Sequence, residues 1–255
     1  MTMLISDLMS SPVRVCRPDD TVSYARNLML KHHISRVLVM DGQRIAGIIT
    51  KKDIGYRLRS RDPTWRRRSP DNEPVSSVMT TDTISISPGS SIHDALVLMV
   101  THMISGLPVT DQGMVLGMVT KSDMIRSPLV KSLDRPVVGV MHDVQQVTEE
   151  HSLDHVIDLM RSGCGKVLVT GDEGAISGII SESDLTFAQE GRAQSEKLRA
   201  GDVMRSPVIT MDETARTVDV IREMSERHIS SLIITNEVGL KGIITRDDII
   251  GEVVL

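Results

Sequence analysis

Apolar residues recur along the chain in one fixed order of helical and alternating spacings, and the order is repeated four times. The apolar stripe is complete in the second copy, where its members are Ile92, Ala95, Leu96, Met99 and Met103. Their i, i+3, i+4, i+7, i+11 spacing is that of one face of a helix. The same spacing begins at Leu153 and at Thr217, and it begins at Val22 in the first copy, where Arg26 interrupts it. The pattern predicts four amphipathic helices.

Two apolar runs joined by a turn follow each predicted helix. In the first copy, residues 37–40 and 45–49 flank the pair Asp41-Gly42, which is a signal for a β-hairpin. A short apolar segment also precedes each helix, at residues 13–15, 84–86, 146–148 and 208–210. A second, short helix is predicted where the last strand ends. Each copy is therefore expected to be a β-α-β-β-α unit, and the chain to be an α/β (α+β) protein.

Each copy ends in the same short motif, a glycine, two apolar residues, a hydroxyl residue and an aspartate three places further on. The four motifs occupy residues 47–53, 117–123, 178–184 and 242–248. A methionine precedes the motif glycine by 38, 38, 37 and 38 residues, at Met9, Met79, Met141 and Met204. Since an internal repeat fixes the architecture, we divide the chain into repeats 1 to 4, at residues 1–60, 74–130, 131–190 and 197–255. One repeat alone has too small a core, so the repeats are expected to pair.

Composition excludes several classes of protein. The net charge of −5 argues against a general nucleic-acid surface, and four aromatic residues in Phe, Tyr and Trp together cannot supply stacking platforms for single strands. No run of about 18 apolar residues is present, and residues 1–8 do not resemble a signal peptide. Cys16 and Cys164 have no metal-ligand spacing and favour a cytoplasmic setting. His151 and His155 form an i, i+4 pair, but no metal site is predicted.

The segment at residues 55–73 is unusual because six arginines lie between Arg57 and Arg68, together with Trp65. It is either a solvated basic loop or a docking surface for an acidic partner or a phosphate-bearing ligand. The connections at 125–135 and 186–200 are expected to be polar and partly helical.

The four motifs, each with a segment like Ile34-Ser35 ahead of the first hairpin strand, resemble the cystathionine-β-synthase-type (CBS) domain. The resemblance covers nearly the whole chain apart from the connections. It implies that two repeats pack through their sheets into a Bateman module, here residues 1–130 and 131–255, and that four repeats form a pseudo-symmetric disc. It also implies that adenosine nucleotides or related adenosyl ligands bind in clefts between paired repeats, as in the gamma subunits of AMP-activated protein kinase.

The motif residues suit such a ligand chemically. An ionised carboxylate can accept hydrogen bonds from both hydroxyls of a ribose, and a hydroxyl beside free N–H groups suits a phosphate. The candidate carboxylates are Asp53, Asp123, Asp184 and Asp248, and the candidate hydroxyls are Thr50, Thr120, Ser181 and Thr245. The motif glycine permits close approach of a ligand or of neighbouring backbone. A structural alternative remains open, because Ser/Thr-x-x-Asp at a helix start is also a capping box. The same residue can both cap the helix and contact a ligand.

Phosphate charge requires a cation, and the resemblance places basic residues just ahead of the first hairpin strand. The matching positions are Ser35-Arg36, Ser105-Gly106, Gly165-Lys166 and Ser230-Ser231. Arg36 and Lys166 are therefore the candidate cations, and Lys52 matches a further basic position. The alternative for each cation is an ordinary surface charge. Gly106 and Ser231 supply no charge, so their sites should be weaker. Repeat 3 ranks lowest unless Lys166 offsets Glu182 beside its motif.

The function expected from the resemblance is that of a non-enzymatic sensor. It would bind AMP, ADP or ATP as a regulatory ligand, sensitive to Mg, and pass the ligand state to an effector protein, with a homodimer as the expected assembly. The alternatives are a sensor of S-adenosylmethionine-type ligands and binding of nucleic acid or an acidic partner through Arg57–Arg68. A domain accessory to an enzyme would need a catalytic domain, for which the chain has no residues to spare.

Overall fold

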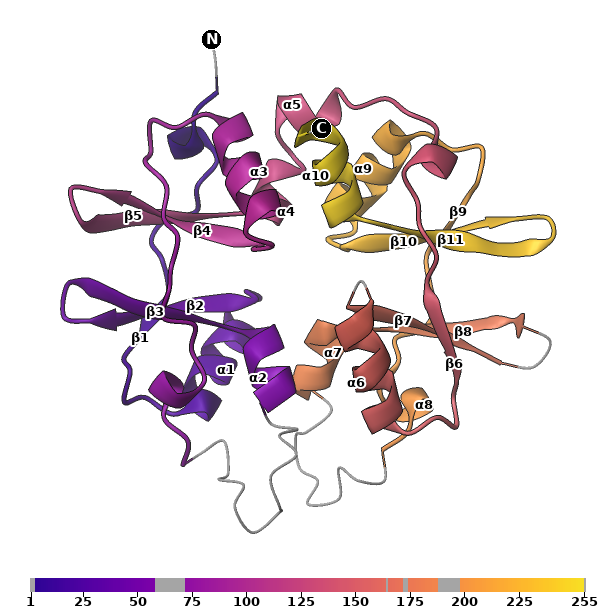
Figure 1. Ribbon diagram of the computed structural model, residues 1–255, viewed down its shortest axis with the longest axis horizontal. Helices are drawn as coiled ribbons and strands as arrows, with labels where there is room; N and C mark the ends of the chain where they lie inside the picture. Colours follow the sequence, from indigo (N-terminus) through magenta and orange to yellow (C-terminus); the bar gives the residue numbers. More distant parts are fainter. Residues whose placement is uncertain (1–2, 58–71, 164, 172–173, 188–197, 255) are drawn as a thin grey trace. The chain divides into compact units, whose positions relative to one another are not determined.

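The computed structural model describes residues 3–57, 72–163, 165–171, 174–187 and 198–254 (Figure 1). All four repeats have the predicted order of a short extended segment, a helix, a hairpin and a second helix. In repeat 2 the first segment is a single bridge, from Ile86 to Val109, where the others have a strand.

The elements of repeats 1 and 2 are β1 (Val15–Cys16), α1 (Val22–Lys31), β2 (Arg36–Asp41), β3 (Arg44–Thr50), α2 (Lys51–Arg57), α3 (Ile92–Thr101), β4 (Gly106–Asp111), β5 (Met114–Thr120) and α4 (Lys121–Met124). The connection to repeat 3 contains α5 (Pro128–Lys131), as the sequence predicted. The elements of repeats 3 and 4 are β6 (Gln145–Thr148), α6 (Leu153–Ser162), β7 (Lys166–Thr170), β8 (Ile176–Ser181), α7 (Glu182–Phe187), α8 (Ala200–Val203), β9 (Thr210–Asp212), α9 (Thr217–Glu226), β10 (Ser231–Asn236), β11 (Gly239–Thr245) and α10 (Arg246–Val254). Short 3-10 turns, at Ile5–Asp7, Val75–Ser77 and Val137–Gly139, begin the first three repeats.

The amphipathic helices begin where a hydroxyl residue can cap them. Thr21, Ser91 and Ser152 each accept a hydrogen bond from the backbone N–H three residues further on. The predicted apolar face is buried along α3, but its last predicted member is not. Helix α3 ends at Thr101, so Met103 lies beyond it with φ +52° and is 90% exposed. The stripe was therefore predicted one turn too long, because a sequence period does not show where the helix stops.

The four repeats are distributed over two compact units, each of which combines alternate repeats. The first unit consists of Met1–Val13, Ile84–Asp143 and Ile209–Leu255, and the second of Arg14–Thr83 and Val144–Val208. The first unit has the two-stranded sheet β4-β5 and the three-stranded sheet β11-β10-β9. The second unit has the sheets β1-β2-β3 and β6-β7-β8 (Figure 1). The hairpin strands pair antiparallel, and the short first strand pairs parallel with the next.

The N-terminal segment of each repeat packs on the neighbouring repeat rather than on its own. Met9 lies against Gly117 of repeat 2, and Met79 lies against Gly47 of repeat 1. Repeats 3 and 4 exchange segments in the same way, with Met204 against Gly178 and Met141 near Gly242. The methionines that align in the sequence therefore bind repeat 1 to repeat 2 and repeat 3 to repeat 4.

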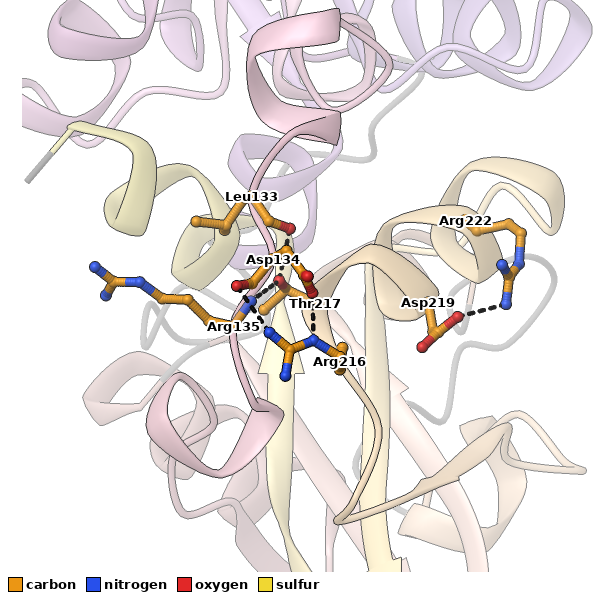
Figure 2. A network of polar contacts seen from close by, with 7 residues as sticks. All are labelled: Leu133, Asp134, Arg135, Arg216, Thr217, Asp219 and Arg222. Carbon is orange, nitrogen blue, oxygen red and sulfur yellow. Dashed lines mark hydrogen bonds and ion pairs between the residues drawn. The ribbon is translucent and has the colours of Figure 1, made fainter.

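Figure 2 shows one end of such an exchanged segment, where residues 133–136 lie against the start of α9. The buried hydroxyl of Thr217 donates to the Leu133 carbonyl at 2.8 Å and accepts from the Arg135 N–H at 2.9 Å. The Thr217 N–H in turn donates to the Arg135 carbonyl, and Arg216 pairs with Asp134. The Arg135 carbonyl thus satisfies a backbone N–H at the helix start that no residue within the helix can reach, and the Thr217 hydroxyl satisfies two backbone groups of the exchanged segment.

The hydrophobic cores of the two units differ. In the first unit one continuous cluster joins both repeats, since Ile249 and Ile250 of α10 belong to the same cluster as Met99, Met124 and Ile125. In the second unit each repeat has its own cluster. The repeats of the second unit meet along α2 and α7, where Tyr56 of α2 packs against the cluster of repeat 3. None of the helices in the described residues is long and apolar enough to cross a membrane.

Candidate functional site

The predicted site residues come together within each repeat because the hairpin register places them opposite one another. Arg36 at the start of β2 pairs with Thr50 at the end of β3, and Lys166 pairs with Ser181 in repeat 3. Gly106 and Ser231 take the same places opposite Thr120 and Thr245 in repeats 2 and 4.

The predicted serines lie beside these pairs in three repeats. The carbonyl of Ser35, of Ser105 and of Ser230 accepts the N–H of the residue that follows the motif hydroxyl. Repeat 3 has Gly165 at this place with φ +70°, where a Cβ atom would lie 2.9 Å from the Glu182 carboxylate. The backbone of repeat 3 therefore requires glycine at this place, which explains why it has no serine there.

All four motif aspartates cap their own helix. In repeat 1 the Asp53 Oδ2 atom accepts from the Thr50 N–H at 2.8 Å and from the Thr50 hydroxyl at 2.6 Å. The corresponding backbone distances are 2.9 Å at Asp123, 2.8 Å at Asp184 and 2.7 Å at Asp248. The capping interpretation is confirmed. Since each hydroxyl donates to its own aspartate through Oδ2, the other carboxylate oxygen, Oδ1, lies outside the cap.

The side chains around each carboxylate distinguish the four sites. The Asp123 Oδ1 atom accepts from Arg126 at 2.7 Å, and the Asp184 Oδ1 atom accepts from Arg205. At Asp248 the His142 Nε2 atom lies 3.3 Å from Oδ2. Within the described part of the chain, the Asp53 carboxylate has no cationic side chain in contact with it.

Burial raises the pKa of Asp53 above its ordinary value of 3.8. The hydrogen bonds from Thr50 and the charge of Lys52 oppose this shift, and the negative charge of Glu182 adds to it. The upward shift of the pKa means that the cost of removing this carboxylate from water exceeds the stabilisation by Thr50 and Lys52. A carboxylate held in that way gains from additional hydrogen-bond donors.

The two residues that follow each motif hydroxyl join alternate repeats. In the first unit Lys121 pairs with Asp247, and Arg246 donates to the Ser122 hydroxyl at 2.7 Å. In the second unit Lys52 Nζ lies 3.0 Å from Glu182, which also accepts from the Tyr56 hydroxyl at 3.0 Å. Lys52, which was predicted to face a phosphate, is thus already paired with Glu182, the acidic residue beside the motif of repeat 3.

Three site residues were not found from the sequence, namely Arg126, His142 and Arg205. A signal for two of them was present, because His142 and Arg205 directly follow the aligned methionines, where repeats 1 and 2 have Ser10 and Thr80. Only the exchange of N-terminal segments shows that these positions reach the motif of the partner repeat. Arg205 N and Ile179 O, for example, are 2.9 Å apart across that contact.

Two further sequence predictions concern the arginine-rich stretch and the histidine pair. The arginine-rich stretch lies almost entirely in residues 58–71, outside the described residues. His151 and His155 stack with their ring centroids 5.0 Å apart, and among the described residues no group of three or more His, Cys, Asp or Glu could hold a metal ion.

Four copies of one β-α-β-β-α fold, each ending in a carboxylate beside a strand-end hydroxyl, define a tandem-repeat protein. The chain belongs to the CBS-domain family, whose model matches residues 5–58, 75–129, 135–191 and 200–255. This confirms the family that the sequence resembled and its four-repeat architecture.

Comparison with known proteins gives relatives over both part and all of the chain. It is 32% identical over 120 residues, 47% of this chain and 81% of the relative, to the CBS domain-containing protein YhcV of Bacillus subtilis. It is 26% identical over 259 residues to the protein MJ1225 of Methanocaldococcus jannaschii, covering 91% of this chain and 92% of the relative. The crystal structure of MJ1225, described as a candidate archaeal homologue of g-AMPK, superimposes with a TM-score of 0.86 at 23% identity and covers 98% and 99% of the two chains.

Proposed function

We propose that this protein is a non-enzymatic regulatory sensor that binds adenosine nucleotides, AMP, ADP or ATP, at the motif ends of its CBS repeats. The observation that carries the proposal is the fourfold motif. Each repeat holds one carboxylate oxygen by its own Thr or Ser and presents the rest of the carboxylate at a strand end.

The chemistry of the motif agrees with a nucleoside ligand. A carboxylate can accept from both hydroxyls of a ribose, and such charge-assisted hydrogen bonds are stronger than neutral ones. Arg36 and Lys166 stand opposite the motif hydroxyls in repeats 1 and 3, where they would meet a phosphate. Because the core contains few aromatic residues, the base is expected to lie between aliphatic side chains.

Relatives support the same class of ligand. The four matches to the CBS family model leave only short connections of the chain unassigned, so the proposal assigns it no catalytic domain. MJ1225, which matches nearly end to end, is described as a candidate homologue of g-AMPK. We extend that description to this chain as an expectation about its ligand, an adenine nucleotide that reports energy state.

The output of the sensor would be a change in how paired repeats are arranged. The exchanged N-terminal segments connect repeat 1 to repeat 2 and repeat 3 to repeat 4, which favours Bateman modules at residues 1–130 and 131–255. A ligand that binds one arrangement better than another shifts the equilibrium between them. An effector protein would read this shift, in the cytoplasm and with the sensor as a homodimer.

The proposal is tested by native mass spectrometry of the purified chain, followed by calorimetry with AMP, ADP, ATP and S-adenosylmethionine, each with and without Mg. Bound adenosine nucleotide, or a micromolar dissociation constant for one of the three, is the expected result. A preference for S-adenosylmethionine would show that the ligand is this adenosyl compound and not a nucleotide. Silence with all four, on protein whose circular dichroism shows the expected fold, would refute the function.

A further inference from the structure

The four motif carboxylates differ in whether the chain itself already supplies a cation to them. At Asp123 the cation is Arg126, which follows α4 and lies three residues away. At Asp184 it is Arg205, which the exchanged segment of repeat 4 brings to repeat 3. At Asp248 the neighbour is the imidazole of His142, which the exchanged segment of repeat 3 brings to 3.3 Å from the capped oxygen Oδ2.

Asp53 has the opposite surroundings. The exchanged segment that reaches it carries Thr80 at the position of Arg205 and His142, and Thr80 is uncharged. Lys52 is the nearest cation along the chain, but its ammonium lies 3.0 Å from Glu182. Among the residues that the structure describes, Asp53 is therefore the one motif aspartate with neither an arginine nor a histidine in contact with its carboxylate.

A cation on a carboxylate competes with a ligand that donates hydrogen bonds. The guanidinium uses a lone pair that a ribose hydroxyl would need, and it neutralises the charge that strengthens such bonds. A ligand must then displace the cation or accept a weaker bond. An open, poorly hydrated carboxylate has no such competitor.

Resting on the proposed function, we infer that Asp53 of repeat 1 is the principal ribose-binding carboxylate of this chain. Arg126 and Arg205 occupy the second oxygen of Asp123 and Asp184 and weaken those sites, and the His142 ring crowds the carboxylate of Asp248. The sequence ranked the sites by their phosphate-facing cations, which also favours repeat 1 through Arg36 and Lys52, whereas this ordering depends on the side chain that contacts each carboxylate. It makes Arg126 and Arg205 specificity-determining residues, since they select which repeat takes the nucleoside.

The test measures AMP binding by native mass spectrometry and calorimetry, with 2′-deoxy-AMP as a probe lacking one ribose hydroxyl. Wild type is expected to show a single strong binding event that the deoxy probe weakens. Asp53→Asn should weaken it by about tenfold or more, because a charge-assisted pair becomes neutral. The amide oxygen can still accept from Thr50, so this variant keeps its helix cap.

The gain-of-site variant is Arg126→Ala, which should add a second AMP-binding event. Arg126 is 48% exposed, so its removal leaves the core intact. The matched control is Arg222→Ala, which breaks an exposed i, i+3 pair with Asp219 of the same kind and leaves every motif untouched. Adding Asp123→Asn to Arg126→Ala should remove the gained event.

Two results would overturn the inference while the proposed function stands. One is AMP binding that survives Asp53→Asn at full strength, and the other is several equal binding events in wild type. Absence of binding for every adenosine ligand would instead refute the proposed function itself, so the two failures are distinct.

Discussion

The motif glycine of repeat 1 provides a sharp test of what the motif does. A Cβ atom added at Gly47 would lie 2.6 Å from the Thr80 carbonyl oxygen and 2.8 Å from the Met79 sulfur. The first of these is a backbone atom, which cannot rotate away. Gly47→Ala must therefore push the exchanged segment of repeat 2 off the strand.

The cost follows from what that segment loses. Ile48 and Thr80 exchange two backbone hydrogen bonds of 2.9 Å each, which widen toward the limit of such bonds when the segment moves. Each bond contributes about 0.5–1.5 kcal/mol, and overpacking adds about 1–3 kcal/mol. Alanine regains about 0.5–1 kcal/mol of backbone entropy. The expected net loss of stability is about 1–5 kcal/mol.

Urea and thermal unfolding, followed by circular dichroism, measure this loss. For a domain of this size it corresponds to a fall in Tm of roughly 2–20 °C. The control is Gly251→Ala in α10, where nothing lies within 4 Å of the added carbon. That change should stabilise by about 0.5–1 kcal/mol, because alanine is the better helix former.

A double-mutant cycle separates backbone from side-chain contact. At Gly117 the close neighbours are all Met9 side-chain atoms, at 2.6, 2.9 and 3.1 Å. Met9→Ala should therefore rescue much of the loss in Gly117→Ala, with a coupling of about 1–3 kcal/mol. Met79→Ala should not rescue Gly47→Ala. If Gly47→Ala were as stable as the Gly251→Ala control but bound AMP poorly, the glycine would serve the ligand and the packing argument would be wrong.

Three further predictions concern single side chains. Thr217→Val keeps the shape of the buried side chain but leaves the Leu133 carbonyl and the Arg135 N–H without their partner, so unfolding should become easier by about 2–4 kcal/mol. Burial raises the pKa of Cys16 to about 12, so in native protein at pH 8 its labelling by a thiol reagent, read by peptide mass mapping, should be at least about a hundredfold slower than in urea. Because burial raises the pKa of Asp53, the folded protein loses stability as pH rises from 3.8 through the raised pKa and the buried carboxyl group ionises. Asp53→Asn should thus gain on wild type in urea unfolding at pH 7 and lose that gain at acid pH.

Each of these has its own control. Thr214→Val removes an exposed hydroxyl bonded to Asp212 and should change stability by less than about 0.5 kcal/mol. Equal labelling of Cys16 in native and unfolded protein would show that the thiol is accessible. A constant difference between Asp53→Asn and wild type at every pH would show that the carboxylate charge carries no cost.

The sequence by itself determined the repeat, the order of elements and the family, because each depends on local periodicity and on short motifs. It also gave the alternative that the hydroxyl and aspartate form a cap, and the structure confirms this at all four copies. What it missed locally was the end of α3, where Met103 continues the apolar period although the helix has stopped at Thr101.

Only the tertiary structure decided which residues surround each motif. Arg205 and Asp184 are 21 residues apart, and His142 and Asp248 still further, so no local pattern joins them. The exchange of N-terminal segments brings them together, because the motif glycine has no side chain and lets the strand accept the neighbouring backbone. The four aspartates are alike in sequence, and they differ because the folded chain, within its described residues, brings an arginine to two of them and a histidine to a third.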